Sequence, residues 1–182
     1  MPDALYFTDD PAACKLIATD PFALLMGCAI DQQVPVQKAF AGPLALKQRV
    51  GTLDPRKLAE LDLEEAFRTK PAIHRFPGSM AGRVRELAAV VAEEYGGDAS
   101  RIWSEAADSS DLKKRLAALP GFGEMKVKMI ASVLAKQYGV AAAKPLVPDH
   151  PMLGDVDSPQ ALADYQAAKR AHKAAMRAAD GG

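Results

Sequence analysis

The chain has 182 residues, of which 49% are hydrophobic and 25% are charged. This length is sufficient for a sizeable core, and it excludes a mini-protein. Lys and Arg together number 23, as do Asp and Glu, so the formal net charge is zero. Such a total provides no overall basic field to attract nucleic acid and no acidic excess typical of disorder. Taken alone, it favours a small-molecule enzyme.

Composition also favours helices over strands. Alanine, the best helix former, occupies 35 positions, whereas aromatic residues make up only 6% of the chain. The N-terminal sequence MPDALYFTDD has no basic segment followed by an apolar stretch, and no run of about 18 apolar residues occurs anywhere. We therefore expect an all-α protein that is cytoplasmic, has no membrane partner and is a monomer.

Hydrophobic periodicity and capping signals divide the chain into helix-sized segments, without an alternating run of strand length. Asp-Pro or Ser-Pro pairs at positions 20, 54 and 158 mark three helix starts, because the first side chain caps the helix and proline suits its first turn. The predicted helices cover residues 21–30, 36–50, a short segment from 55, 62–67, 83–95, 100–107, 111–119, 124–138 and 159–179. Residues 71–82 (PAIHRFPGSMAG) are predicted to form a loop, and the Pro-rich residues 141–158 an irregular segment.

The two cysteines, Cys14 and Cys28, are too few for a four-cysteine zinc site or iron–sulfur cluster, and their spacing excludes a C-x-x-C pair. Free cysteine is among the most buried residue types. We therefore predict two buried thiols, no metal ligand set, no iron–sulfur cluster and no cofactor.

The most specific local pattern is LPGFGEMK at residues 119–126, a tight Gly-x-Gly turn between two predicted helices. Gly121 and Gly123 permit a positive φ and let the backbone approach a ligand closely. The second helix presents free N–H groups and the positive end of its dipole at this turn, which suits a phosphate. The helix dipole disfavours cations near this end, so the presence of Lys126 and Lys128 indicates that they face a bound anion. The alternative is a glycine-rich helical hairpin with a solvated charged face.

The zero net charge conceals an uneven distribution. Residues 111–149 contain seven cations and three anions, a net charge of +4. Residues 1–31 contain one cation and five aspartates, a net charge of −4. The segment around the Gly-x-Gly turn is therefore basic, as expected for a surface that binds nucleic acid.

The sequence LPGFGEMKVKMIASVLA, at residues 119–135, resembles the helix-hairpin-helix motif of the HhH-GPD superfamily of base-excision DNA glycosylases. Residues 29–33 (AIDQQ) are similar to the end of a buried helix of that superfamily, and residues 82–88 (GRVRELA) to the start of another. The resemblance covers roughly residues 20–155.

The resemblance implies a single glycosylase domain over residues 1–182, built as a two-lobed helical bundle with an interlobe cleft. The helix-hairpin-helix motif would occupy residues 111–138, and the C-terminal helix 159–179 would pack back on the other lobe. A flipped base would enter the cleft. The backbone of double-stranded DNA would bind at Gly121, Phe122, Gly123, Lys126 and Lys128.

Release of a base gives C1′ of the sugar oxocarbenium character, and a nearby carboxylate stabilises this charge and orients water. In the resembled superfamily this carboxylate lies in the loop after the second hairpin helix, where Asp149 stands here. This chain departs from the superfamily pattern, because His150-Pro151 follows directly and the loop is long. His150, Asp155 and Asp157 therefore stay open as occupants of the catalytic position. Asp149 is alternatively the N-cap of a short turn.

Bifunctional superfamily members carry a Schiff-base lysine two residues after the second hairpin glycine, and Met125 holds that position here. The implied chemistry is hydrolysis without strand cleavage, and Lys126 is assigned to phosphate contact. Gln33 matches the position of a side chain that fills the gap left by the flipped base; the alternative is an amide that satisfies a helix end. The candidates to hold a structural monovalent cation, as in the resembled hairpins, are the carbonyls of Ala117, Leu119 and Phe122.

We therefore expect a monofunctional DNA glycosylase of base excision repair, which hydrolyses the N-glycosidic bond of a flipped damaged base. An alkylated purine is favoured, because the Pro-Asp loop and the missing lysine look more like the alkylation-repair branch; uracil and oxidised bases stay open. Two other classes are a non-catalytic helix-hairpin-helix DNA-binding protein that has lost glycosylase activity, and a small-molecule enzyme unrelated to DNA.

Overall fold

The computed structural model describes residues 1–181, and every regular element within this range is helical, as predicted. The α-helices are α1 (Pro11–Thr19), α2 (Pro21–Ile30), α3 (Val36–Val50), α4 (Pro55–Leu58), α5 (Glu64–Arg68), α6 (Pro77–Glu94), α7 (Arg101–Ser104), α8 (Ser109–Ala117), α9 (Glu124–Gln137) and α10 (Pro159–Asp180). Two 3₁₀ helices, η1 (Ala141–Leu146) and η2 (Leu153–Asp155), connect α9 to α10. No single helix in the described part of the chain is both long and apolar enough to cross a membrane; α1 and α2 qualify only as a pair bent by 114°.

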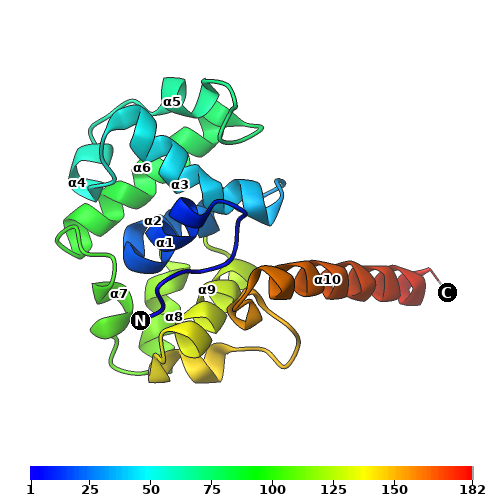
Figure 1. Ribbon diagram of the computed structural model, residues 1–182. Coiled ribbons are helices and arrows are strands. Elements are labelled where there is room, and N and C mark those ends of the chain that lie inside the picture. Colours follow the sequence, from blue (N-terminus) through cyan, green and yellow to red (C-terminus); the bar gives the residue numbers. More distant parts are fainter. Residues whose placement is uncertain (182) are drawn as a thin grey trace.

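Helix α2 lies at the centre of the molecule, with α3 to α6 on one side and α8 and α9 on the other (Figure 1). Its sequence PFALLMGCAI has no charged side chain, and every residue from Phe22 to Ile30 is buried. A helix that is apolar on all sides requires such burial. Polar side chains therefore adjoin α2 only at its two ends. The C-terminal end, at Asp31, borders the candidate site described below.

The predicted helix starts are confirmed by local hydrogen bonds. Asp20 accepts the N–H of Phe22 at 2.9 Å, and Pro21 occupies the first turn of α2. Asp54 and Ser158 each accept a backbone N–H in the same way, at 3.0 and 3.1 Å. Each cap satisfies a donor that the helix itself leaves unpaired.

Two helices differ from the prediction. Helix α1 was not expected from its short apolar pattern, but Asp10 caps it and Ile17 is buried in the core. Helix α6 begins at Pro77 rather than at residue 83, so part of the predicted loop 71–82 is helical. Proline suits the first turn, and the buried Met80 extends the apolar face of the helix, which outweighs the helix penalty of about 1 kcal/mol for each nearby glycine.

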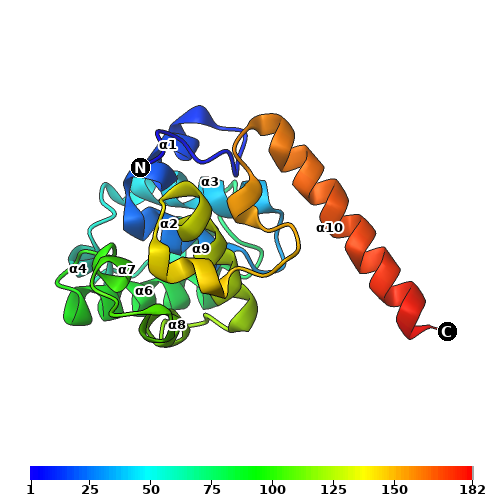
Figure 2. The same ribbon diagram turned by 90° about the horizontal axis from the view of Figure 1, so that it is seen from below.

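Helix α10 leaves the body of the protein and projects into solvent (Figures 1 and 2). Leu162 is buried, and Gln166 exchanges hydrogen bonds of 3.0 and 2.9 Å with Gln37 of α3. Every described residue from position 167 onward is exposed. The prediction that helix 159–179 packs back on the other lobe is therefore wrong beyond its first two turns. The free part carries one large apolar side chain, Met176, and so has no apolar stripe to bury.

Candidate functional site

The turn between α8 and α9 is anchored from inside and open on the outside. Phe122 at its tip is only 4% exposed and joins the core with Leu116 of α8. Gly121 has a φ of +76°, in the left-handed region that favours glycine. Gly123 is the N-cap of α9, and no side chain caps the helix there. The first N–H groups of α9 are therefore available to an external acceptor such as a phosphate.

Arg83 of α6 closes over this turn. A Cβ added to Gly121 would lie 2.6 Å from Arg83 Nη1, so any other residue at this position would force the side chain of Arg83 to move. The same Nη1 donates a hydrogen bond of 3.2 Å to Oε1 of Gln32. Arg83 thereby links the α8–α9 turn to the loop that follows α2.

His74 holds that loop from the protein interior. It is only 2% exposed, and its Nε2 lies 2.8 Å from the carbonyl oxygen of Gln32. Its Nδ1 accepts the N–H of Phe76 at 3.0 Å. A ring that accepts at Nδ1 and donates at Nε2 is the neutral tautomer. His74 is therefore a positioning residue for residues 31–34 and for Phe76.

Gln33 and Phe76 project from these two supported loops. Gln33 is exposed and has a φ of +58°, a conformation that costs about 1 kcal/mol or more for a residue with a side chain. Phe76 is 48% exposed, with the Arg75 guanidinium 5.1 Å from its ring centroid. Both line a hollow of about 70 Å³, much smaller than typical ligand pockets of about 300–1,000 Å³. The amide of Gln33 satisfies no helix end among the described residues, and its gap-filling role stays a prediction.

The two lysines of α9 are placed differently from each other. Lys126 points into the molecule, where its Nζ donates a hydrogen bond of 2.8 Å to the carbonyl of Ala29, at the C-terminal end of α2. Burial lowers the pKa of Lys126. This inward position corrects its assignment to a phosphate, because helix C-terminal carbonyls attract the ammonium group. Lys128 stays at the surface, 3.0 Å from Glu124, and Met125 is 66% exposed beside the turn.

Asp31, directly after α2, is an ionisable group without a role among the predicted site residues. Its carboxyl is half-buried, and burial raises its pKa, while the charges of Lys169 and Lys126 lower it. Burial, and then the charge of Asp31, raises the pKa of Tyr165 on α10. Charges from two other helices, Lys126 of α9 and Lys169 of α10, thus act on one carboxyl. Such a perturbed group is a candidate for function, and its sequence signal is a carboxylate directly after a long uncharged helix.

The loop between η1 and η2 carries Asp149 and His150, and both residues are exposed. The ring of His150 stacks on that of His172 of α10, with centroids 5.9 Å apart. His172 follows Lys169 by less than one turn of α10, so this loop lies on the same side of the molecule as Asp31. No helix begins at Asp149, and its predicted capping alternative therefore finds no support.

The other predicted carboxylates differ in their surroundings. Asp155 accepts the N–H of Met152 at 2.8 Å and forms an ion pair with Lys136 of α9. These contacts lower the pKa of Asp155 despite burial, and they hold η2 against α9. Asp157 is exposed. The structure thus gives Asp155 a structural role and leaves Asp157 free at the surface.

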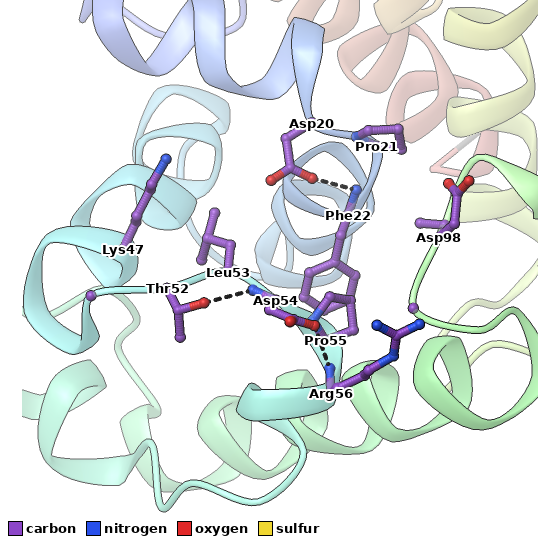
Figure 3. Close-up of a pocket in the computed structure, with 13 residues that line it drawn as sticks. Asp20, Pro21, Phe22, Lys47, Thr52, Leu53, Asp54, Pro55, Arg56 and Asp98 are labelled. Carbon is purple, nitrogen blue, oxygen red and sulfur yellow. Dashed lines mark hydrogen bonds between the residues drawn. The ribbon is translucent and has the colours of Figure 1, made fainter.

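A second hollow, of about 530 Å³, lies between the starts of α2 and α4 and the segment before α7 (Figure 3). Its volume is typical of a ligand pocket. However, its three carboxylates, Asp20, Asp54 and Asp98, all accept nearby backbone N–H groups. Arg56 donates to a backbone carbonyl in the same region. These four polar groups therefore serve local structure, and the hollow contains no predicted site residue.

Over residues 1–181, no group of three or more His, Cys, Asp or Glu side chains is placed to hold a metal ion. Cys14 and Cys28 are buried and unpaired, as predicted. Of the carbonyls predicted to hold a monovalent cation, that of Leu119 accepts the N–H of Phe122 at 3.1 Å. The cation site itself stays a prediction.

Comparison of the chain with protein-family models, with curated proteins and with solved structures finds no match. The resemblance to the HhH-GPD superfamily therefore stays a prediction that rests on the motif residues of this chain.

Proposed function

We propose that the protein is a monofunctional DNA glycosylase, which binds double-stranded DNA at the α8–α9 turn and hydrolyses the N-glycosidic bond of a flipped damaged base. One observation carries the proposal: three exposed features lie on one connected surface. Arg83 links the uncapped N-terminus of α9 to the loop with the exposed Gln33. His74 links the same loop to the exposed Phe76. These are the parts needed to hold a backbone, fill a gap and separate stacked bases.

The α8–α9 turn supplies the contact with the DNA backbone. Gly121 and Gly123 let a phosphate approach the free N–H groups of α9, and the buried Phe122 keeps the turn rigid. Lys128 lies at the surface in an ion pair with Glu124, and a phosphate would compete with that carboxylate for its ammonium group. These contacts recognise phosphates rather than bases, so they confer affinity without sequence specificity.

The loops opposite the turn act on the base stack. Extrusion of a nucleotide costs a few kcal/mol, and an inserted side chain stabilises the opened step. Phe76 is aromatic and exposed, and Gln33 offers an amide for the orphaned base. The hollow of about 70 Å³ between them has to widen before it holds a base, so movement of Phe76 is part of the proposal.

Two carboxylates are candidates to promote hydrolysis. Asp149 has the sequence position that the resemblance assigns, and Asp31 has the half-buried position beside Lys126 and Lys169. In either case the carboxylate stabilises oxocarbenium character at C1′ and orients the attacking water. Met125 replaces the Schiff-base lysine, so the base leaves by hydrolysis without strand cleavage.

The test is a base-release assay with duplex oligonucleotides that each contain one alkylated purine, uracil or oxidised base. We expect release of one lesion class under single-turnover conditions. Asp149→Asn or Asp31→Asn is expected to reduce the rate by about 100-fold with duplex binding retained. Asp9→Asn, which removes an exposed carboxylate from the segment before α1, is the control for charge. Borohydride trapping is expected to give no covalent adduct.

Several results would overturn the proposal. Wild-type rates in the asparagine variants of Asp31, Asp149, Asp155 and Asp157 alike would exclude the carboxylate mechanism. A borohydride adduct that disappears in Lys126→Ala would exclude purely hydrolytic chemistry. Salt-sensitive duplex binding without release of any lesion would support the rival function, a DNA-binding protein without glycosylase activity.

A further inference from the structure

The projecting part of α10 combines strong positive charge with complete exposure. Asp180 is the single anion after residue 166, and every described residue from position 167 onward is exposed. The cations of this segment are Lys169, Arg170, Lys173 and Arg177. Over residues 1–181, none of the four takes part in an ion pair. A surface of this kind attracts an extended anionic partner.

The cations lie on one side of the helix. At 100° per residue, Lys169, Lys173 and Arg177 follow one another every fourth position, about 6 Å apart along the axis, and Arg170 lies next to them. This row continues the side of α10 that packs on the body at Leu162 and Gln166. In the free part of the helix, the opposite side carries alanines at 167, 168, 171, 174, 175, 178 and 179.

The row begins at the candidate site. Lys169 is near enough to Asp31 for its charge to act on that carboxyl, and its Nζ lies 5.9 Å from the ring centroid of Tyr165. His172 stacks on His150, next to Asp149. From there the row runs outward with the projecting helix (Figure 2). It therefore extends the surface that contains the carboxylates rather than forming a separate patch.

We propose that the free part of α10 is a second DNA-binding element, whose row of Lys169, Arg170, Lys173 and Arg177 contacts phosphates of a duplex beside the site. This inference rests on the DNA-binding part of the proposed function and not on base excision. A duplex fits the row because it presents regularly repeated negative charge, and because the helix lacks the apolar side chains that a protein partner would bury. The contact is independent of base sequence.

The experiment compares two triple variants that remove the same charge. Arg170→Ala, Lys173→Ala and Arg177→Ala are combined in the test variant, and Lys169 is kept because it neighbours Asp31. The control variant combines Lys15→Ala, Lys47→Ala and Lys57→Ala, three exposed lysines on α1, α3 and α4. Alanine preserves helix propensity in both, and circular dichroism verifies the helix content.

Binding of each protein to an undamaged duplex is followed by fluorescence anisotropy at several KCl concentrations. Each lost phosphate contact reduces the slope of log K against log salt by about 0.9. The test variant is expected to lower the slope by about 2–3 and to weaken binding at low salt by at least about tenfold, whereas the control variant stays within about twofold of wild type.

Equal slopes for wild-type, test and control proteins would overturn this inference. Base release by the test variant with an unchanged slope would overturn it while leaving the proposed function intact. A reduced slope in a protein that releases no base would support α10 as a DNA-binding element and refute only the excision chemistry. If the protein binds vesicles that contain phosphatidylserine through α10 and does not bind duplex DNA, the proposed DNA partner of α10 is wrong.

Discussion

Replacement of Gly121 by alanine tests the description of the α8–α9 turn most directly. Gly121 has a φ of +76°, and an L-residue in the left-handed region costs about 1–2 kcal/mol. The new Cβ would also lie 2.6 Å from Nη1 and 2.7 Å from Cδ of Arg83. Arg83 has to move away, which removes its hydrogen bond to Gln32, worth about 0.5–1.5 kcal/mol.

The reduced freedom of the unfolded chain offsets about 0.4–1 kcal/mol of this cost. We therefore expect Gly121→Ala to lower the free energy of unfolding by about 2 kcal/mol, or Tm by about 4–8 °C for a chain of this size. Urea denaturation and thermal scans measure both quantities. Gly123→Ala is the matched control, because Gly123 has a φ of −82° and no atom lies within 4 Å of an added Cβ.

The double variant Arg83→Ala with Gly121→Ala separates the two contributions. Without the guanidinium the clash disappears, so its cost is expected to be about 0.5–1 kcal/mol less than the sum of the single variants. Equal stabilities of Gly121→Ala and Gly123→Ala would refute the left-handed turn. Strict additivity in the double variant would refute the contact between Gly121 and Arg83.

Three further predictions concern groups elsewhere in the fold. Burial raises the pKa of Asp31, so its charged form destabilises the folded state above the unfolded pKa. Asp31→Asn should therefore raise the free energy of unfolding at pH 7, and a gain that does not shrink toward pH 4 in urea titrations would contradict this. Burial raises the pKa of Tyr138 to about 12, so its stabilising contribution is complete below pH 10 and is lost as the pH rises toward 12. Tyr138→Phe should therefore flatten the decline of stability measured between pH 10 and 11. A Cβ on Gly154 would lie 2.2 Å from the backbone oxygen of Ser132, so Gly154→Ala should lower the free energy of unfolding in urea by more than about 3 kcal/mol. Gly82 lies in α6 and faces open space, so Gly82→Ala should raise that free energy by about 0.5–1 kcal/mol.

Much of the helical framework could be predicted because it depends on residues close together in the chain. Asp20, Asp54 and Ser158 cap helices through bonds to N–H groups two or three residues away, so their roles are visible in the sequence. The spacing of Leu112 and Leu116 likewise predicts a buried face of α8. The start of α6 was missed because burial of Met80 by distant residues overrides the loop-forming tendency of glycine.

The candidate site was only partly predictable. The turn with Gly121 and the exposed Gln33 were selected from the sequence, and the structure ties both to one surface through Arg83. The surroundings of Asp31 could not be predicted, because the charges that act on its carboxyl belong to Lys126 and Lys169, far away in the chain.

By itself, the sequence determined the all-α fold, the helix caps and the glycine turn between α8 and α9, since these depend on local conformational preference and short-range hydrogen bonds. Only the tertiary structure decided where half-buried charges point and which helix ends remain free. Lys126 turns inward because the C-terminal carbonyls of α2 lie beside it, and α10 projects because no apolar surface draws it back to the body. Such outcomes depend on neighbours brought together by packing, which periodicity along the chain does not encode.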